Sequence, residues 1–116
     1  EIYKVVESFE EILESIVIGQ EWEDDIRIVL FVRLQEKIFL DEELKAKIKN
    51  NLRHLVSPRH VPAKIISVDD IPRTRSGKIT ELAVRDIVHG KKIKNMEALS
   101  NPEALDLFKN LYELNN

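Results

Sequence analysis

Residues 25–34 alternate so regularly that they predict a β-strand, and the rest of the fold has to be built around that strand. One predicted face carries Ile26, Ile28, Leu30, Val32 and Leu34. The opposite face carries Asp25, Arg27, Val29, Phe31 and Arg33. Successive side chains of a strand point to opposite faces. The chain therefore needs a sheet with at least one apolar face.

Helix and strand signals lie on both sides of this segment. Apolar residues at helical spacing predict a helix within residues 1–14, followed by a short strand over 16–18 and a turn at Gly19. Asp41 is placed to cap a helix over residues 42–55. The apolar stripe of that helix is Leu44, Ile48, Leu52 and Leu55.

Shorter elements follow. Pro58 and Pro62 break the helix and lead into a predicted strand over residues 64–68. Residues 69–78 contain few apolar side chains and predict an exposed loop. Residues 81–88 predict a helix.

The last predicted element is a helix with Asn101 as its N-cap and Pro102 as its first residue. One side of it would carry Leu105, Phe108, Leu111 and Tyr112. About three strands with short connections predict a small α+β fold rather than a large parallel sheet. At 116 residues, we expect one domain that spans residues 1–116.

Composition argues against several classes of protein. No apolar run approaches the roughly 20 residues of a membrane-spanning helix, so we predict no membrane segment. The chain has no cysteine, which excludes disulfides and thiolate metal sites and fits a cytoplasmic protein. Its three histidines have no paired carboxylates at ligand spacing, so we predict no metal site.

The net charge of −3 conceals a segregation of charge. Residues 53–94 hold 10 basic and 4 acidic side chains, whereas residues 1–52 hold 7 basic and 13 acidic ones. The middle block predicts either a partner with several negative charges, such as a phosphorylated ligand, or a solvated basic face. Within it, Arg73 and Arg75 either meet phosphates or face solvent.

The most unusual segment of that block is residues 71–78, Ile-Pro-Arg-Thr-Arg-Ser-Gly-Lys. The proline restricts the backbone that enters the segment, and Gly77 permits a turn with positive φ. Lys78 follows, with no acidic residue between positions 71 and 80. An ammonium group presented in this way suits the oxygens of a phosphate and a carboxylate. The alternative is a solvated surface lysine.

Pro72, Thr74, Ser76, Gly77 and Lys78 together resemble the last core motif of the adenylate-forming superfamily, which includes the acyl-CoA synthetases. The resemblance implies that Lys78 is catalytic and approaches the carboxylate and the α-phosphate while an acyl-adenylate forms. It also implies that Ser76 and Gly77 shape the loop. The order of the predicted elements is similar to the mobile C-terminal domain of these enzymes, so the resemblance covers essentially the whole chain.

The same resemblance implies the cofactors and the partner. We expect ATP, magnesium and CoA to be used, and to be bound mainly by an N-terminal domain of the same enzyme. That N-terminal ATP- and acyl-binding domain and the hinge would precede these 116 residues. The isolated chain is therefore expected to be inactive by itself.

Two further features resemble particular members of the superfamily. Arg53 lies 25 positions before Lys78, where acetyl-CoA synthetases have an arginine that contacts the 3′-phosphate of CoA. The alternative is an arginine that only complements the dipole of its helix. Residues 57–62, and a tail with Gly-Lys-Lys at 90–92 and Leu-Ser-Asn-Pro-Glu-Ala-Leu at 99–105, resemble acetoacetyl-CoA synthetases. This implies acetoacetate as the acid, with an acetyl- or propionyl-CoA synthetase as the alternative.

A stand-alone module that binds a phosphate group or nucleic acid through residues 53–94 is the alternative from another class. Only seven residues are aromatic, mostly at core spacing, and no nucleic-acid-binding motif is present. We therefore expect the partners to be the N-terminal domain, ATP, CoA and a short carboxylic acid, with no nucleic acid and no membrane.

Overall fold

A computed structural model describes residues 1–78 and 80–116, and its strands form one three-stranded sheet in the order β1-β2-β3. Its helices and strands are α1 (Ile2–Val6), β1 (Ile12–Trp22), β2 (Asp25–Leu34), α2 (Glu42–Leu55), β3 (Lys64–Ser67) and α3 (Glu81–Val88). The described residues also form four 3-10 turns: η1 (Pro58–His60), η2 (Met96–Ala98), η3 (Pro102–Phe108) and η4 (Tyr112–Asn115). The small α+β prediction is confirmed. None of the helices within the described ranges has the length and apolar character needed to cross a membrane.

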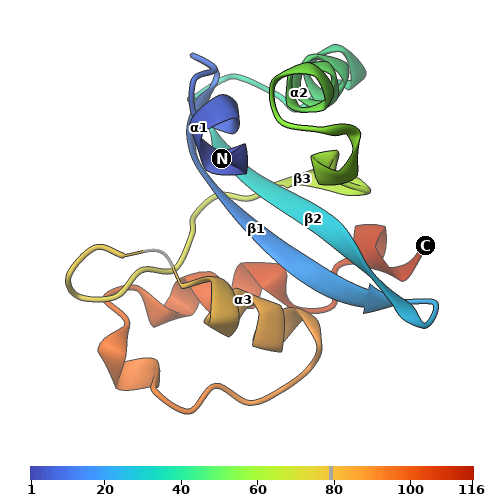
Figure 1. The fold of residues 1–116 in the computed structure, drawn as a ribbon. Coiled ribbons are helices and arrows are strands. Elements are labelled where there is room, and N and C mark those ends of the chain that lie inside the picture. Colours follow the sequence, from blue (N-terminus) through green and yellow to red (C-terminus); the bar gives the residue numbers. More distant parts are fainter. Residues whose placement is uncertain (79) are drawn as a thin grey trace.

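The sheet lies between two layers of helices (Figure 1). Strands β1 and β2 pair antiparallel, and β2 and β3 pair parallel, with α2 in the connection between them. On β2, Leu30 and Val32 pack with α1 and α2, whereas Val29 and Phe31 pack with α3 and the C-terminal turns. The predicted alternation is therefore correct, and both faces of the centre of β2 are buried.

Strand β1 is longer than predicted, and the predicted turn at Gly19 is wrong. Gly19 pairs with Ile28 inside the hairpin, and the strand continues to Trp22. A Cβ atom at Gly19 would lie 2.9 Å from the side chain of Ile26, so the glycine serves a close approach instead of a turn. The turn consists of Glu23 and Asp24, whose φ values of 50° and 62° suit a two-residue hairpin.

The predicted helix within residues 1–14 is also mostly wrong, because α1 ends at Val6. The Glu7 carboxylate accepts hydrogen bonds from the backbone N–H of Ser15 at 3.0 Å and from its hydroxyl at 2.9 Å. These bonds hold the start of β1 against the end of α1. Phe9 and Ile12 then reach the same apolar cluster from a loop and a strand, so their helical spacing did not require a helix.

The prediction for α2 is confirmed in its bounds and its cap. Asp41 accepts a hydrogen bond from the backbone N–H of Leu44 at 2.8 Å. Leu44, Ile48 and Leu52 are buried as predicted. Leu55 was wrongly included in the buried stripe, since it is 69% exposed at the last position of the helix.

The C-terminal segment is not the continuous helix predicted from Asn101 to Tyr112. It forms the turns η3 and η4, separated by an extended residue, Lys109, and by Asn110 at a φ of 52°. Asn101 makes no side-chain capping bond. Phe108 still packs as expected, edge-on against Phe31 with ring centroids 4.8 Å apart.

Candidate functional site

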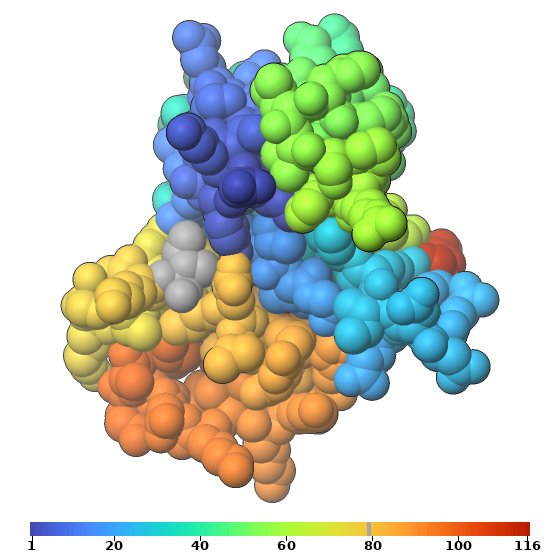
Figure 2. Space-filling view, viewed as in Figure 1, coloured from blue at the N-terminus to red at the C-terminus, as the bar shows by residue number. Residues whose placement is uncertain are grey.

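The loop of residues 69–78 rises from a buried base to an exposed tip. Ile71 is fully buried in the cluster with Val84 and Phe108, and Pro72 is buried beside it, so the prediction of a wholly exposed loop is wrong for these two residues. Residues 75–78 are exposed. The space-filling view shows this yellow segment protruding beside the orange C-terminal segment (Figure 2). The core therefore anchors a loop whose tip remains accessible.

The tip closes on itself as a tight turn. Thr74 donates its backbone N–H to the Lys78 carbonyl at 2.8 Å, and the Thr74 carbonyl accepts from the N–H of Gly77 at 2.9 Å. The Thr74 hydroxyl oxygen also accepts from the N–H of Lys78 at 3.2 Å and lies 3.0 Å from the Ser76 hydroxyl. Gly77 has a φ of 87°, a conformation that other residues adopt at a cost. Ser76 and Gly77 thus lie within a closed turn that ends at Lys78.

Lys78 is exposed at the end of this turn. Within residues 1–78 and 80–116, no carboxylate oxygen lies within 4.0 Å of its ammonium group. Its positive charge is therefore available to an anion that approaches the tip. A lysine ammonium carries three hydrogen-bond donors and concentrates its charge at one atom, which suits it to phosphate or carboxylate oxygens.

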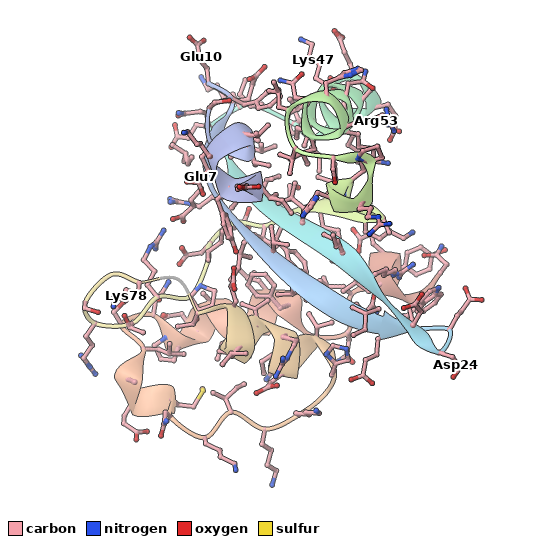
Figure 3. The ribbon with its side chains drawn as sticks, viewed as in Figure 1. Glu7, Glu10, Asp24, Lys47, Arg53 and Lys78 are labelled. Atoms are coloured by element: carbon pink, nitrogen blue, oxygen red, sulfur yellow. The ribbon has the colours of Figure 1, made fainter. Side chains whose placement is uncertain are left out.

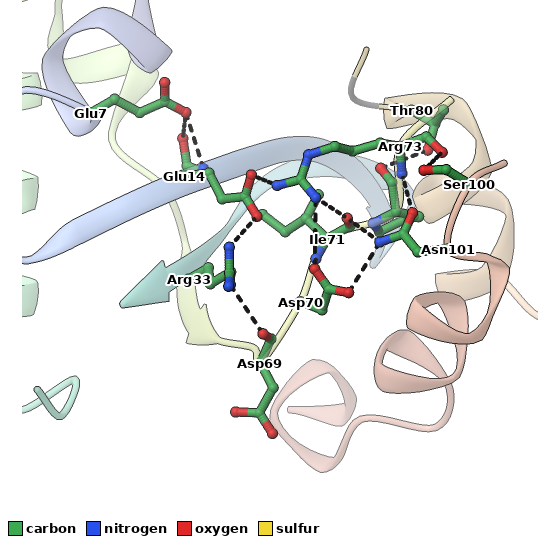
Figure 4. Close-up of polar contacts among 12 residues, drawn as sticks. Glu7, Glu14, Arg33, Asp69, Asp70, Ile71, Arg73, Thr80, Ser100 and Asn101 are labelled. Carbon is green, nitrogen blue, oxygen red and sulfur yellow. Dashed lines mark hydrogen bonds and ion pairs between the residues drawn. The ribbon is translucent and has the colours of Figure 1, made fainter. Parts of the chain in front are cut away.

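Arg73, at the base of the same turn, faces the protein. Its guanidinium pairs with Glu14 of β1 and lies 3.8 Å from an Asp70 carboxylate oxygen. Glu14 also pairs with Arg33 of β2 at 3.2 Å, and Arg33 donates to the Asp69 carbonyl at 3.2 Å (Figure 4). Since its ion-pair partners lie within the chain, Arg73 ties the loop to the sheet. The sequence did not reveal Glu14, which lies where the pairing of β1 with β2 shifts register, between Ile12 and Glu14.

The loop is also tied to the start of α3, which in turn is tied to α1. The Thr80 hydroxyl donates to the Pro72 carbonyl at 3.2 Å. The Tyr3 hydroxyl donates to a Glu81 carboxylate oxygen and accepts from the backbone N–H of Val17 at 2.9 Å. Burial, and then the hydrogen bond to Glu81, raise the pKa of Tyr3 above its usual value. The phenol therefore stays protonated and keeps donating to Glu81.

A cavity of about 890 Å³ opens between α3 and residues 92–99, beside the loop. Its lining includes Thr74 from the loop, Thr80 and Leu82 from the start of α3, and Ile93 and Leu99 from residues 92–99. Thr74 and Leu99 form an isolated antiparallel bridge at this wall. The loop and residues 92–99 thus form adjoining parts of the wall of this cavity.

Arg53 is not brought together with Lys78. It lies near the end of α2, exposed, and its guanidinium donates to the side-chain oxygen of Asn50 at 3.0 Å. Figure 3 places Arg53 and Lys78 on well-separated parts of the molecule. A single small ligand would not reach both in this conformation of the chain. A reaction that uses both residues would have to use two surfaces of this domain, or use the two residues in separate steps.

The histidines are dispersed. His60 shares a hydrogen bond with Ser57 at 2.6 Å, and His89 accepts from the backbone N–H of Glu21 at 3.0 Å. In the part of the chain that the structure describes, no group of three or more His, Asp or Glu side chains could hold a metal ion.

Known proteins match this chain over nearly its full length. Residues 1–78 match the family described as AMP-binding enzyme C-terminal domain. The chain is 64% identical over 114 residues to the acetoacetyl-coenzyme A synthetase of Rhizobium meliloti (strain 1021), covering 98% of this chain and 18% of that protein. It is 43% identical over 117 residues to the acetoacetyl-CoA synthetase of Xenopus tropicalis, covering 100% of this chain and 17% of that protein.

A solved structure agrees with these sequence matches. The acetoacetyl-CoA synthetase from Streptomyces lividans is similar with a TM-score of 0.85 at 37% identity. The similarity covers 93% of this chain and 17% of that one. The chain thus spans less than a fifth of the length of the relatives it matches.

Proposed function

Because the chain belongs to the family of AMP-binding enzyme C-terminal domains, we propose that it is the C-terminal catalytic subdomain of an acid-thiol ligase. The complete enzyme would use ATP to join acetoacetate to CoA, giving acetoacetyl-CoA. One observation carries the proposal: Lys78 ends a closed, exposed turn with its charge available to an anion. The 64% identity to a protein named acetoacetyl-coenzyme A synthetase supports acetoacetate as the acid.

In the first half-reaction, a carboxylate oxygen of acetoacetate would attack the α-phosphorus of ATP. The bond from that phosphorus to pyrophosphate breaks, leaving the acyl-adenylate. Negative charge on the α-phosphate and carboxylate oxygens must be offset in the transition state. Lys78 would donate hydrogen bonds to these oxygens from its ammonium group. A donor that is already positioned contributes without reorganisation during the step.

In the second half-reaction, the CoA sulfur would attack the acyl carbonyl carbon and AMP would leave. We propose that the domain swings between the two steps and presents another face to the N-terminal domain. Arg53 would then contact the 3′-phosphate of CoA. The separation of Arg53 from Lys78 supports this assignment of the residues to different steps (Figure 3).

The proposal places the ATP site, the magnesium ion and the acyl pocket mainly in the N-terminal domain of the same enzyme. The exposed ammonium group of Lys78 and the guanidinium of Arg53 fit phosphate oxygens. The magnesium ion, when bound, would offset charge on the phosphates of ATP. We propose a cytoplasmic location for the enzyme, which the lack of cysteine in these 116 residues fits.

The proposal is tested by Lys78→Ala in the full-length enzyme. Adenylate formation, followed as acetoacetate-dependent exchange of pyrophosphate into ATP, should fall by a factor on the order of 100 to 1,000, because a positioned transition-state donor is lost. Thioester formation from supplied acyl-adenylate should be unaffected, since the second half-reaction does not use this lysine. Equal loss in both half-reactions would contradict the assignment.

One matched control and three further measurements make the result specific. Lys47→Ala removes another exposed lysine, on α2 and well separated from Lys78 in Figure 3, and should leave adenylate formation unchanged. Acetate and propionate, offered to the unmodified enzyme, test the choice of acid, and a preference for either would replace acetoacetate. The 116-residue chain should release pyrophosphate only when mixed with its N-terminal domain. A salt-dependent complex with an RNA or DNA oligomer, in an enzyme that forms no adenylate, would favour the binding module.

A further inference from the structure

The loop of residues 69–78, which ends at Lys78, is hydrogen-bonded to a segment far along the chain, residues 97–101. Arg75 donates its backbone N–H to the Ala98 carbonyl and its side-chain Nε–H to the Glu97 carbonyl, each at 3.1 Å. Ser100 donates its backbone N–H to the Arg73 carbonyl at 2.9 Å. This segment lies beyond residue 78, where the match to the family ends.

Asn101 makes the most specific contacts in this segment (Figure 4). Its side-chain oxygen accepts from the backbone N–H of Arg73 at 2.8 Å. Its side-chain nitrogen donates to the Ile71 carbonyl at 2.9 Å and to an Asp70 carboxylate oxygen at 3.0 Å. An amide can accept at one end and donate two hydrogens at the other, and a carboxylate or an aliphatic side chain cannot do both.

These contacts act on the backbone that places Lys78. The turn from Thr74 to Lys78 is closed by its own hydrogen bonds, so it is expected to move as a unit. The turn is attached to residues 97–101 at two places. One is Arg73, just before the turn, whose N–H is held by Asn101 and whose carbonyl is held by Ser100. The other is Arg75, within the turn, which bonds to Ala98 and Glu97. The ion pair with Glu14 holds the side chain of Arg73, whereas Asn101 and Ser100 hold its backbone. Among these contacts, Asn101 is the one whose side chain holds the backbone where the turn leaves the core.

We propose that Asn101 is a positioning residue for adenylate formation, which sets the approach of Lys78 to the reacting phosphate and carboxylate; this rests on the proposed function of Lys78. Catalysis by a positioned donor is sensitive to displacement, and about 1 Å can lower the rate on the order of 100-fold. A change at Asn101 should therefore affect the half-reaction that uses Lys78 and spare the one that does not.

The test uses three variants of the full-length enzyme: Asn101→Ala, Asn101→Asp, and Asn101→Asp combined with Asp70→Asn. Asn101→Ala should lower kcat for adenylate formation roughly 10- to 100-fold. Thioester formation from supplied acyl-adenylate should stay within about twofold, which also shows that each variant is folded. Asn95→Ala is the matched control: Asn95 is exposed, lies two residues before this segment and makes no capping bond, so the variant should match the unmodified enzyme.

The paired variant separates positioning from general damage. Asn101→Asp places two carboxylates together at positions 70 and 101 and should be at least as slow as Asn101→Ala. Adding Asp70→Asn restores a donor and an acceptor between the two positions, so adenylate formation should recover to within about fivefold of the unmodified enzyme. Recovery stays incomplete for two reasons. The Ile71 carbonyl loses the Asn101 donor and keeps only the longer bond from Arg73 at 3.4 Å, and the 3.8 Å Arg73–Asp70 pair is lost.

Three outcomes would each overturn the assignment. They are unchanged adenylate formation in Asn101→Ala, equal loss in both half-reactions, and no recovery in the paired variant. The Lys78→Ala result distinguishes its failure from that of the proposed function. If Lys78→Ala forms adenylate normally, both proposals are wrong. If Lys78→Ala is inactive in that step while Asn101→Ala is normal, only the role of Asn101 is wrong.

Discussion

The centre of the sheet and the Lys78 loop are held in place by different forces. Phe31 of β2 is fully buried between apolar side chains from α3 and the C-terminal turns. The turn from Thr74 to Lys78 has no buried side chain, and polar contacts at Arg73 and Arg75 hold it. Apolar burial mainly determines whether the chain folds, whereas these polar contacts determine where one charged group is presented. Stability and the position of Lys78 should therefore respond to different substitutions.

Phe31→Ala should give the largest loss of stability. The change leaves a cavity in the cluster and removes the edge contact with Phe108, so the free energy of unfolding should fall by about 3–5 kcal/mol. Thermal or urea unfolding of the chain, followed by circular dichroism, measures this loss. In the full-length enzyme both half-reactions should decline together, since the whole domain is affected.

Tyr112→Ala is the matched control for this substitution. Tyr112 is 77% exposed, so removing its ring should change the free energy of unfolding by no more than about 0.5 kcal/mol. A similar loss in both aromatic variants, or a loss confined to adenylate formation in Phe31→Ala, would break the distinction between the sheet and the loop.

Glu14→Gln should have an intermediate effect on stability and a selective effect on activity. Its carboxylate lies between the guanidinium groups of Arg33 and Arg73, and its side chain is only 14% exposed. Without that charge the free energy of unfolding should fall by about 1–3 kcal/mol. Adenylate formation should fall more than thioester formation, because Arg73 is the base of the Lys78 turn.

Glu42→Gln provides the comparison for a carboxylate at the surface. Glu42 is 92% exposed and pairs with Lys45 at 3.4 Å within α2. Loss of its charge should therefore have little effect on the free energy of unfolding or on adenylate formation. Urea unfolding measures the stability of each variant, and the two half-reaction assays measure its activity. If Glu14→Gln affected both half-reactions to the same degree, the distinction between contacts that stabilise the sheet and contacts that position Lys78 would be weakened.

The elements that the sequence predicted well are those whose signals are local. Residues 25–34, 42–55 and 81–88 have the predicted bounds, because period and capping are properties of neighbouring residues. The missed features depend on tertiary contacts. Gly19 indicated a turn, yet it allows the side chain of Ile26 to approach β1. The hairpin turn at Glu23 and Asp24 lacks the glycine or asparagine that usually indicates one.

The candidate site shows the same division. Lys78 was predicted from a motif within eight consecutive residues, 71–78, and its catalytic role stays a prediction. Glu14 and Asn101 carried no such signal. Asn101 before Pro102 is a typical helix start, and only the folded chain brings it to residues 70–73. Side chains that position a loop from a distant segment have no periodicity that a single sequence can display.

Ser100→Ala should have the smallest effect and sharpens the comparison within the loop contacts. Ser100 holds the Arg73 carbonyl mainly through its backbone N–H at 2.9 Å, which alanine retains. Its hydroxyl lies 3.4 Å from the same carbonyl and is exposed, so its removal should cost less than about 0.5 kcal/mol. Adenylate formation should stay within about twofold of the unmodified enzyme. A loss as large as that of Asn101→Ala would mean that any change near the loop disturbs Lys78, and that the amide of Asn101 has no special part.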